Sequence, residues 1–222
     1  MNGNPATPTN HPPSGGRSWA AFAAAPHRLF FWSGAFYATV VMVVWVTQQA
    51  SLYTTLLSPW VWPLPFGPAH GFMMVYGVMG FFFAGFLSTT FPRWLSQAPI
   101  PPSVYLPAWA GMTAGAHLFW VGLAAGAGWS LAGVLLLLVG QGRLWLAWAS
   151  ILRKAADHPQ RVFPLTLLVA LTLGLCGQGL FGLAVAGGWS GGYAGARWVG
   201  LYGYVLPVVL SVAWRMVPFF TS

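Results

Sequence analysis

Six long apolar stretches, separated by breaks rich in proline, glycine or charge, dominate this sequence. An α-helix needs about 20 consecutive apolar residues to cross the hydrocarbon core of a bilayer, and each stretch is about that long. Hydrophobic residues make up 57% of the chain and charged residues only 5%. A soluble domain carries about 25% charged residues, so the sequence predicts an all-α, polytopic transmembrane helix bundle whose main partner is the lipid bilayer.

We expect six transmembrane helices and no β-sheet, because no alternation of apolar and polar residues survives between the breaks. The expected spans are, to within a few residues, Leu29–Gln48, His70–Phe91, Tyr105–Ala127, Ser130–Leu152, Val162–Gly187 and Trp198–Phe219. The glycine-rich segment Gly187–Gly195 is expected to be a loop. Residues 1–26, rich in proline, asparagine and glycine, are expected to form a disordered cytoplasmic tail before a six-helix domain over 27–222.

The placement of the basic residues predicts the orientation in the membrane, because lysine and arginine accumulate on the cytoplasmic side. One side of the predicted bundle collects Arg17, Arg28, Arg93, Arg153, Lys154 and Arg161, with Arg143 and Arg215 near the same side. The other side holds only Arg197. Both termini are therefore expected to be cytoplasmic. Because the basic residues lie singly between apolar stretches, we do not expect a nucleic-acid partner.

Acidic and thiol groups are too few for several kinds of chemistry. Asp157 is the single carboxylate side chain, and the chain has no glutamate. Carboxylate dyads, two-metal sites and oxygen-caged magnesium or calcium are therefore excluded, and with them glycosidases, aspartic proteases, polymerases and kinases. One cysteine, Cys176, excludes an intrachain disulfide and a thiolate zinc site.

Polar residues at membrane depth are the candidate functional residues, because each needs a partner in hydrocarbon. His70 opens the second span and His117 lies near the middle of the third. Either imidazole is a candidate metal or haem ligand, and His117 has the alternative of a hydrogen bond across to a residue such as Gln178. Arg143 and Arg215 either extend to the cytoplasmic interface or bind an anionic group such as a haem propionate or a lipid headgroup.

Small residues follow His70 on one helical face, and this face has two interpretations. At 100° per residue the face comprises Met73, Gly77, Gly80, Ala84 and Ser88. Small residues let neighbouring helices approach closely, which is the commoner use of such a stripe. The alternative is a groove in which a flat macrocycle lies against the glycines with the imidazole at its edge.

Three fragments of the sequence resemble the NnrS family. The segment HGFMMVYGVMGFFFAGFLSTTFPRW, from His70 to Trp94, is similar to the family's HxHEMxFG followed at the same spacing by GFLLTAxPNW. PHRLFF, from Pro26 to Phe31, resembles the family's opening, and the closing WRMVPFFTS resembles its GRVIPxFT motif. Members of the family are usually about twice as long, and this chain resembles their N-terminal half. It has Phe72 and Met73 where the family has its second histidine and its glutamate.

The resemblance implies a multi-pass protein of the bacterial inner membrane that binds haem, expected to be haem b, with copper as a further metal. It also implies a link to the nitric oxide response or to respiratory redox chemistry. His70 is then the first candidate ligand and His117 the second, with Arg143 and Arg215 placed to bind propionates.

The alternative function is a non-catalytic structural or assembly subunit of a larger membrane complex, because the second histidine and the glutamate are missing. In that case its glycine-rich helix faces pack against other subunits or a second copy. The start of the second span also looks a little like the haem-ligand helix of oxidase subunit I. The further histidines of a haem–copper centre are, however, absent from this sequence.

Overall fold

The computed structural model describes residues 14–55, 57–58 and 60–221, and all regular structure in these ranges is helical. The helices are α1 (Ser14–Ala23), α2 (Pro26–Tyr53), α3 (Phe66–Phe72), η1 (Met73–Val78), α4 (Met79–Trp94), α5 (Pro102–Ala125), α6 (Ala127–Lys154), α7 (Val162–Gly187), α8 (Ser190–Trp198), η2 (Val199–Val205) and α9 (Leu206–Thr221). The segments η1 and η2 are π-helices. The predicted all-α class is confirmed.

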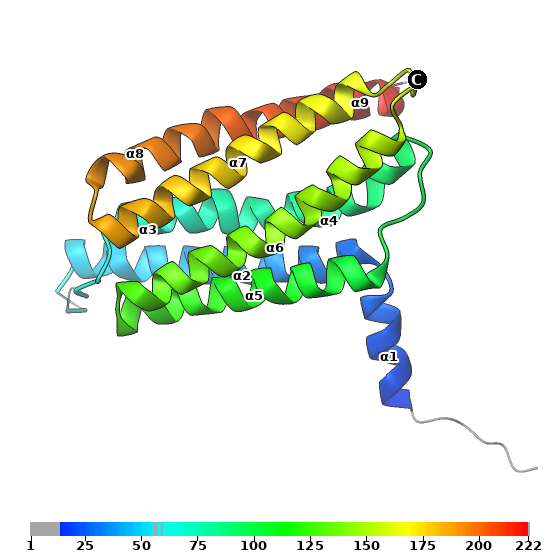
Figure 1. Cartoon of the computed structure of the whole chain (residues 1–222). Coiled ribbons are helices and arrows are strands. Elements are labelled where there is room, and N and C mark those ends of the chain that lie inside the picture. The colour runs from blue at the N-terminus through cyan, green and yellow to red at the C-terminus, as the bar shows by residue number, and fades with distance from the viewer. Residues whose placement is uncertain (1–13, 56, 59, 222) are drawn as a thin grey trace, which may run out of the picture.

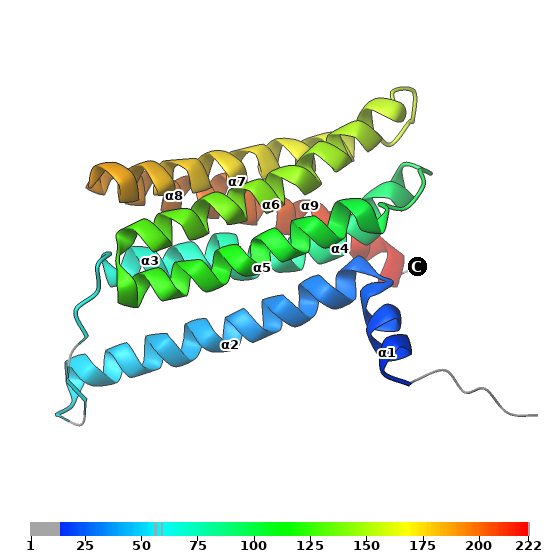
Figure 2. The same ribbon diagram turned by 60° about the horizontal axis from the view of Figure 1, so that its bottom comes forward.

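Six long rods run antiparallel in an elongated bundle (Figure 1). Two of the rods are composite, because α3, η1 and α4 follow one another without a break, and so do α8, η2 and α9. Viewed from another side, α2 lies along one edge and α7 along the opposite edge, with α5 between them (Figure 2). We call the end that holds Arg28, Arg93, Arg153 and Arg161 the basic end, and the opposite end the His70 end.

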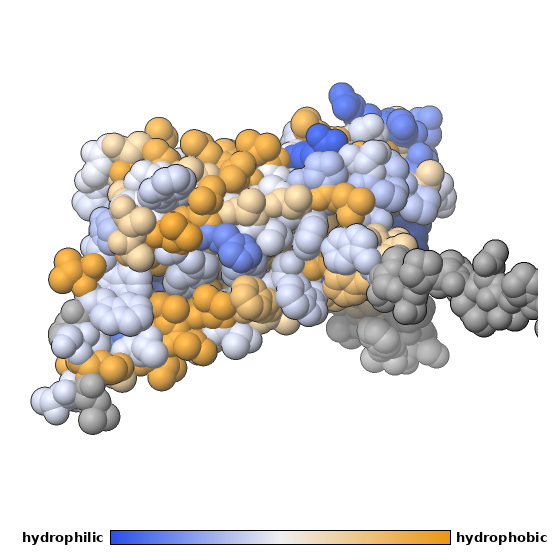
Figure 3. Space-filling view, turned by 90° about the horizontal axis from the view of Figure 1, so that it is seen from below, coloured by the Kyte–Doolittle hydropathy of each residue, from blue (hydrophilic) through white to orange (hydrophobic). Residues whose placement is uncertain are grey.

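Five helical segments are long and apolar enough to cross a membrane, namely Pro26–Tyr53, Phe66–Trp94, Ala127–Lys154, Val162–Gly187 and Ser190–Met216. The sixth rod, α5, is not among them, although it has 24 residues and packs along α6. Large apolar side chains point outward from several of the five segments, for example Val46, Val139 and Leu183. Apolar residues cover much of the face in Figure 3, and hydrophilic residues gather toward the basic end. A multi-pass membrane protein explains this surface.

Part of the predicted tail is helical. Residues 1–13 lie outside the described part of the chain, but α1 occupies Ser14–Ala23, where we expected disorder. Side chains from two other helices bind the backbone at the end of α1: Arg28 Nη1 donates to Ala21 O at 2.5 Å, and Tyr105 Oη donates to Ala23 O at 2.8 Å. Because the last carbonyls of a helix have no partner within it, these donors stabilise α1.

The predicted loop at Gly187–Gly195 is much shorter than expected, because α8 begins at Ser190. Gly188, with φ 64°, makes the turn after α7. Gly192 packs so closely on α7 that an added Cβ would lie 2.8 Å from Ala184 Cβ. The glycines that suggested a loop here allow two helices to lie in contact.

The tightest helix pair in the bundle is α5 with α6, which share a short turn at Gly126. Gly115 faces Gly133 and Gly111 faces Gly140, so the two backbones come into direct contact. A Cβ added to Gly115 would lie 2.7 Å from both Gly133 O and Leu137 N. This closely packed pair also carries two of the predicted site residues, His117 on α5 and Arg143 on α6.

Candidate functional site

His70 lies in the last turn of α3, at the His70 end of the second rod. Its half-buried imidazole packs against the Trp45 ring of α2, with the ring centroids 4.2 Å apart, and is 6.4 Å from the Phe66 ring. The buried Nδ1 atom has no hydrogen-bond partner. The structure therefore presents an aromatic-lined imidazole that is free of hydrogen bonds among the described residues.

His117 is more exposed, and its environment is different. Its Nδ1 lies 2.5 Å from Tyr37 Oη and 2.9 Å from Thr113 O, while Tyr37 Oη also donates to Thr113 O at 3.0 Å. The Tyr37 side chain is almost fully buried, so it fixes the imidazole to α2. The predicted alternative, a hydrogen bond across to another helix, is what the structure shows, with Tyr37 in place of Gln178 as the partner.

The structure does not bring the two histidines into one site. Both rings pack against α2, but at Trp45 and Tyr37, which are eight residues apart. Eight helical residues span about 12 Å along the axis. Within the described part of the chain, no group of three or more histidine, cysteine, aspartate or glutamate side chains is close enough to hold a metal.

Arg143 extends from α6 toward the basic end and binds the first turn of α5. Its Nη2 donates to Ser103 O at 2.9 Å, and its Nε donates to Val104 O at 3.2 Å. Ser103 O has no helical partner, because the residue four positions later is Pro107, which lacks an N–H. Arg143 therefore satisfies a backbone carbonyl that a proline leaves free.

Arg215 also has partners within the chain. Its Nη2 donates to Gln160 Oε1 at 2.7 Å, and its guanidinium lies 5.2 Å from the Trp94 ring centroid and 5.5 Å from that of Phe163. Trp94 is the last residue of the second rod, and His70 lies 24 residues earlier, near the opposite end of that rod. A helix of 24 residues spans about 36 Å. Arg215 therefore cannot reach a carboxylate on a group ligated by His70, and Arg143 is directed to the first turn of α5 at the basic end.

The glycine face that follows His70 is packed. A Cβ added to Gly80 would lie 2.6 Å from Gln141 Nε2, and one added to Gly77 would lie 2.9 Å from Met73 Cε. Close helix packing, the commoner interpretation, is therefore correct for Gly80, where the neighbour belongs to α6, whereas the space beside Gly77 is filled by Met73 of the same rod. The open glycines of this rod are Gly67 and Gly71, where an added Cβ would meet nothing within 4 Å.

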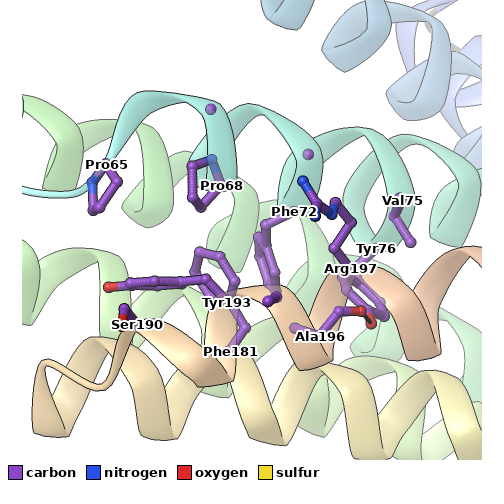
Figure 4. A pocket seen from close by; sticks show the side chains of 13 residues that line it. Pro65, Pro68, Phe72, Val75, Tyr76, Phe181, Ser190, Tyr193, Ala196 and Arg197 are labelled. Atoms are coloured by element: carbon purple, nitrogen blue, oxygen red, sulfur yellow. Dashed lines mark hydrogen bonds between the residues drawn. The ribbon is translucent and has the colours of Figure 1, made fainter.

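Gly67 and Gly71 line a cavity of about 440 Å³ between α3–η1 and α8, which we call the outer groove. Figure 4 shows Phe72, Phe181 and Tyr193 along its length and Arg197 beside it. Its lining is mostly apolar, and its volume falls in the range of small-molecule sites, about 300–1,000 Å³. His70 does not line it, because the imidazole lies on the α2 side of the rod.

The two π-helices meet beside the outer groove. Tyr76 in η1 stacks on Tyr204 in η2, with ring centroids 6.0 Å apart, and Tyr76 Oη donates to Ala196 O at 2.6 Å. Two buried glutamine side chains connect η1 to α6 and α7. Gln178 Nε2 donates to Gln141 Oε1 at 2.8 Å, and Gln141 Nε2 donates to Tyr76 O at 2.8 Å. π-Helical turns occur frequently at functional sites.

Sequence reasoning missed Tyr76, Gln141 and Tyr204 as a connected group. A signal was present, because the tetrapeptides VYGV at Val75–Val78 and LYGY at Leu201–Tyr204 are similar and both lie in π-helices. Gly200, which precedes the second tetrapeptide, leaves room for the Tyr76 ring, since an added Cβ would lie 2.6 Å from Tyr76 Oη.

Comparison with known proteins identifies one family. A family model described as NnrS protein matches residues 21–222. No curated protein and no solved structure matches the chain. The matched range includes α2 to α9 and therefore both π-helices, His70 and the outer groove.

Proposed function

Because the chain belongs to the NnrS family, we propose that it is a bacterial inner-membrane protein that binds haem b through His70 in connection with the nitric oxide response. Copper is the alternative metal at the same imidazole. The observation that carries this proposal is the His70 ring, whose buried Nδ1 has no hydrogen-bond partner. An imidazole ligand needs a nitrogen that no other group occupies, and His70 meets this condition.

The other predicted site residues fit the proposal less well. Tyr37 and Thr113 hold His117 through Nδ1, which leaves Nε2 for a ligand, but at a level of α2 about 12 Å from that of His70. Arg143 and Arg215 have partners far from His70. The proposal therefore gives the haem one protein ligand. Haem held there would supply an iron atom that can bind a small ligand such as nitric oxide. The Trp45 ring packs against the imidazole and the Phe66 ring lies nearby, and these contacts favour one orientation of His70.

Optical spectroscopy of the purified full chain tests this role of His70. We expect a Soret band that His70→Ala abolishes and that His117→Ala retains, with metal analysis to distinguish iron from copper. In the His70→Gly variant, added imidazole should restore the band, because it can fill the space of the missing side chain. A band that survives His70→Ala and disappears with His117→Ala would contradict the assignment.

The proposal includes a sixth membrane crossing by α5 and cytoplasmic termini. Its support is the antiparallel order of the rods, which places Arg28, Arg93, Arg153 and Arg161 at one end of the bundle. Positive residues favour the cytoplasmic side. A reporter fused after Ser222 that is active only in the cytoplasm should be active, and an inactive reporter would contradict this orientation.

A second candidate function is a structural or assembly subunit, and a specific observation favours it. The two histidines and two arginines that could hold haem do not come together in one site. Within the described part of the chain, His117, Arg143 and Arg215 each make hydrogen bonds to other groups, and His70 does not. A subunit of this kind would purify without colour and in fixed stoichiometry with other membrane proteins. A haem content near one per chain would exclude it.

A further inference from the structure

A second cavity, of about 370 Å³, opens at the basic end of the bundle. The turn between α1 and α2, the end of α4 and the proline-rich connector before α5 enclose it, and we call it the basic-end cavity. Two of the fragments that resemble the family border it: Pro26 and His27 come from the first fragment, and Ser88, Thr89 and Arg93 from the second. It lies at the opposite end of the second rod from His70, so it is separate from the proposed haem ligand.

Ser88 is the unusual side chain of this cavity. It is only 2% exposed, it lines the cavity, and its Oγ has no hydrogen-bond partner. The next two hydroxyls behave in the ordinary way, because Thr89 and Thr90 each donate to Phe86 O, at 2.8 and 2.9 Å. A buried hydroxyl without a partner is unfavourable, and the residue that carries this hydroxyl borders the cavity.

The charges around the basic-end cavity are positive. Arg93 and His27 line it, and neither side chain has a hydrogen bond or an ion pair among the described residues. Helices α2 and α5 both begin here, at Pro26 and Pro102, and helix N-termini favour negative charge. The carbonyl end of α4 is also here, but Pro92 O already accepts the N–H of Gln97 at 2.8 Å.

We propose that the basic-end cavity binds a phosphate group, with Arg93 and His27 as cationic or N–H donors and the Ser88 hydroxyl as a buried donor. An oxyanion satisfies all three groups at once, whereas an apolar ligand would leave them unpaired. The cavity is larger than a phosphate ion and has room for a small attached group such as glycerol. The phosphate can therefore come from the solvent or from a lipid headgroup at the membrane surface.

Binding to the delipidated full chain in maltoside micelles tests the proposal. One arm titrates inorganic phosphate against sodium chloride at matched ionic strength, and the other titrates dihexanoyl phosphatidylglycerol. Calorimetry gives the affinity, and thermal unfolding gives the stabilisation by the ligand. Saturable binding of inorganic phosphate identifies a solvent anion, and binding of the lipid alone identifies a headgroup.

Two variants and one control assign the binding to this cavity. Arg93→Gln should weaken binding at least about tenfold, the factor expected when one charged hydrogen bond is lost. Arg153→Gln removes a charge from the same end but not from the cavity lining, and should leave the affinity unchanged. Equal affinities for wild type, Arg93→Gln and Arg153→Gln, or no binding in either arm, would overturn the proposal.

Ser88→Ala separates a binding role from a structural one. Without phosphate this variant should unfold at the same temperature as wild type or a higher one, because it removes an unpaired buried hydroxyl. With phosphate it should show a weaker affinity and a smaller stabilisation than wild type. A loss of stability without phosphate, together with an unchanged affinity, would show that the Ser88 hydroxyl is structural and overturn its role as a donor.

Discussion

Glycines have opposite structural roles in two regions of this bundle. Between α5 and α6, Gly115 and Gly133 allow two backbones to touch, and an added Cβ on Gly115 would lie 2.7 Å from backbone atoms of α6. In the outer groove, Gly67 and Gly71 border open space, and an added Cβ would meet nothing within 4 Å. The same residue type therefore builds a closed helix contact in one region and a cavity wall in the other.

The two regions also differ in how they use polar groups. The α5–α6 pair is held by backbone proximity, with Arg143 supplying donors to the first turn of α5. Beside the outer groove, π-helices replace regular α-helix, and buried tyrosine and glutamine side chains connect the rods. We infer that the first region is built for rigidity and the second for binding, and four substitutions test this contrast.

Gly115→Leu should have the largest effect, because its side chain has no space between α5 and α6. Overpacking a well-packed interior costs about 1–3 kcal/mol, and separating two helix backbones should exceed that range. We expect this variant to unfold at a much lower temperature or to fail to fold. Gly142→Ala is the matched control on α6, where an added Cβ meets nothing within 4 Å. Equal melting temperatures for the two variants would contradict a closed contact.

Gln141→Leu should have the next largest effect, because it removes the glutamine that connects η1 to Gln178 of α7. The fully buried Gln178 and the carbonyl of Tyr76 would both lose the hydrogen bond that Gln141 makes with them. An unpaired buried polar group costs about 1–3 kcal/mol. Replacing Gln178 as well should recover part of this loss, which chemical denaturation of both variants can measure. A double variant less stable than Gln141→Leu would show that the amides act independently.

Arg143→Met should lower the stability by a smaller amount, and the size of this loss should depend on Pro107. It leaves Ser103 O without its donor, which should cost about 1 kcal/mol of unfolding free energy. In the Pro107→Ala background a backbone N–H can bind this carbonyl, so the same substitution should cost less there. Four variants unfolded in parallel give the coupling energy, and strict additivity would mean that Arg143 does not compensate for Pro107.

Much of the fold could be predicted from the sequence, because apolar length and helix breakers are local properties. The predicted span Val162–Gly187 has the same bounds as α7. The helix α1 and the early start of α8 were missed, because contacts with distant residues such as Tyr105 and Ala184 stabilise them. The π-helices were missed for the same reason, since packing between rods determines the change in hydrogen-bond register.

The site was harder to predict than the fold. Sequence shows that His70 and His117 are polar residues at membrane depth, but not which neighbour each will face. That choice depends on helix rotation, which places His70 against Trp45 and His117 against Tyr37. Arg143 shows the same limit, because its role follows from a proline in another helix. The predicted groove along Gly77 and Gly80 is filled by side chains, and the groove that the structure has instead, at Gly67 and Gly71, is not lined by His70.

Gly71→Ala should have the smallest effect, and it tests the binding region from within. The added methyl group projects into the outer groove, so no atom has to move. Alanine is better than glycine in a helix by about 1 kcal/mol, so the melting temperature should stay constant or rise slightly. Gly200→Ala, where an added Cβ would lie 2.6 Å from Tyr76 Oη, should lower it. If both substitutions destabilise the protein equally, the groove is closed in solution, and the contrast between a rigid and a binding region fails.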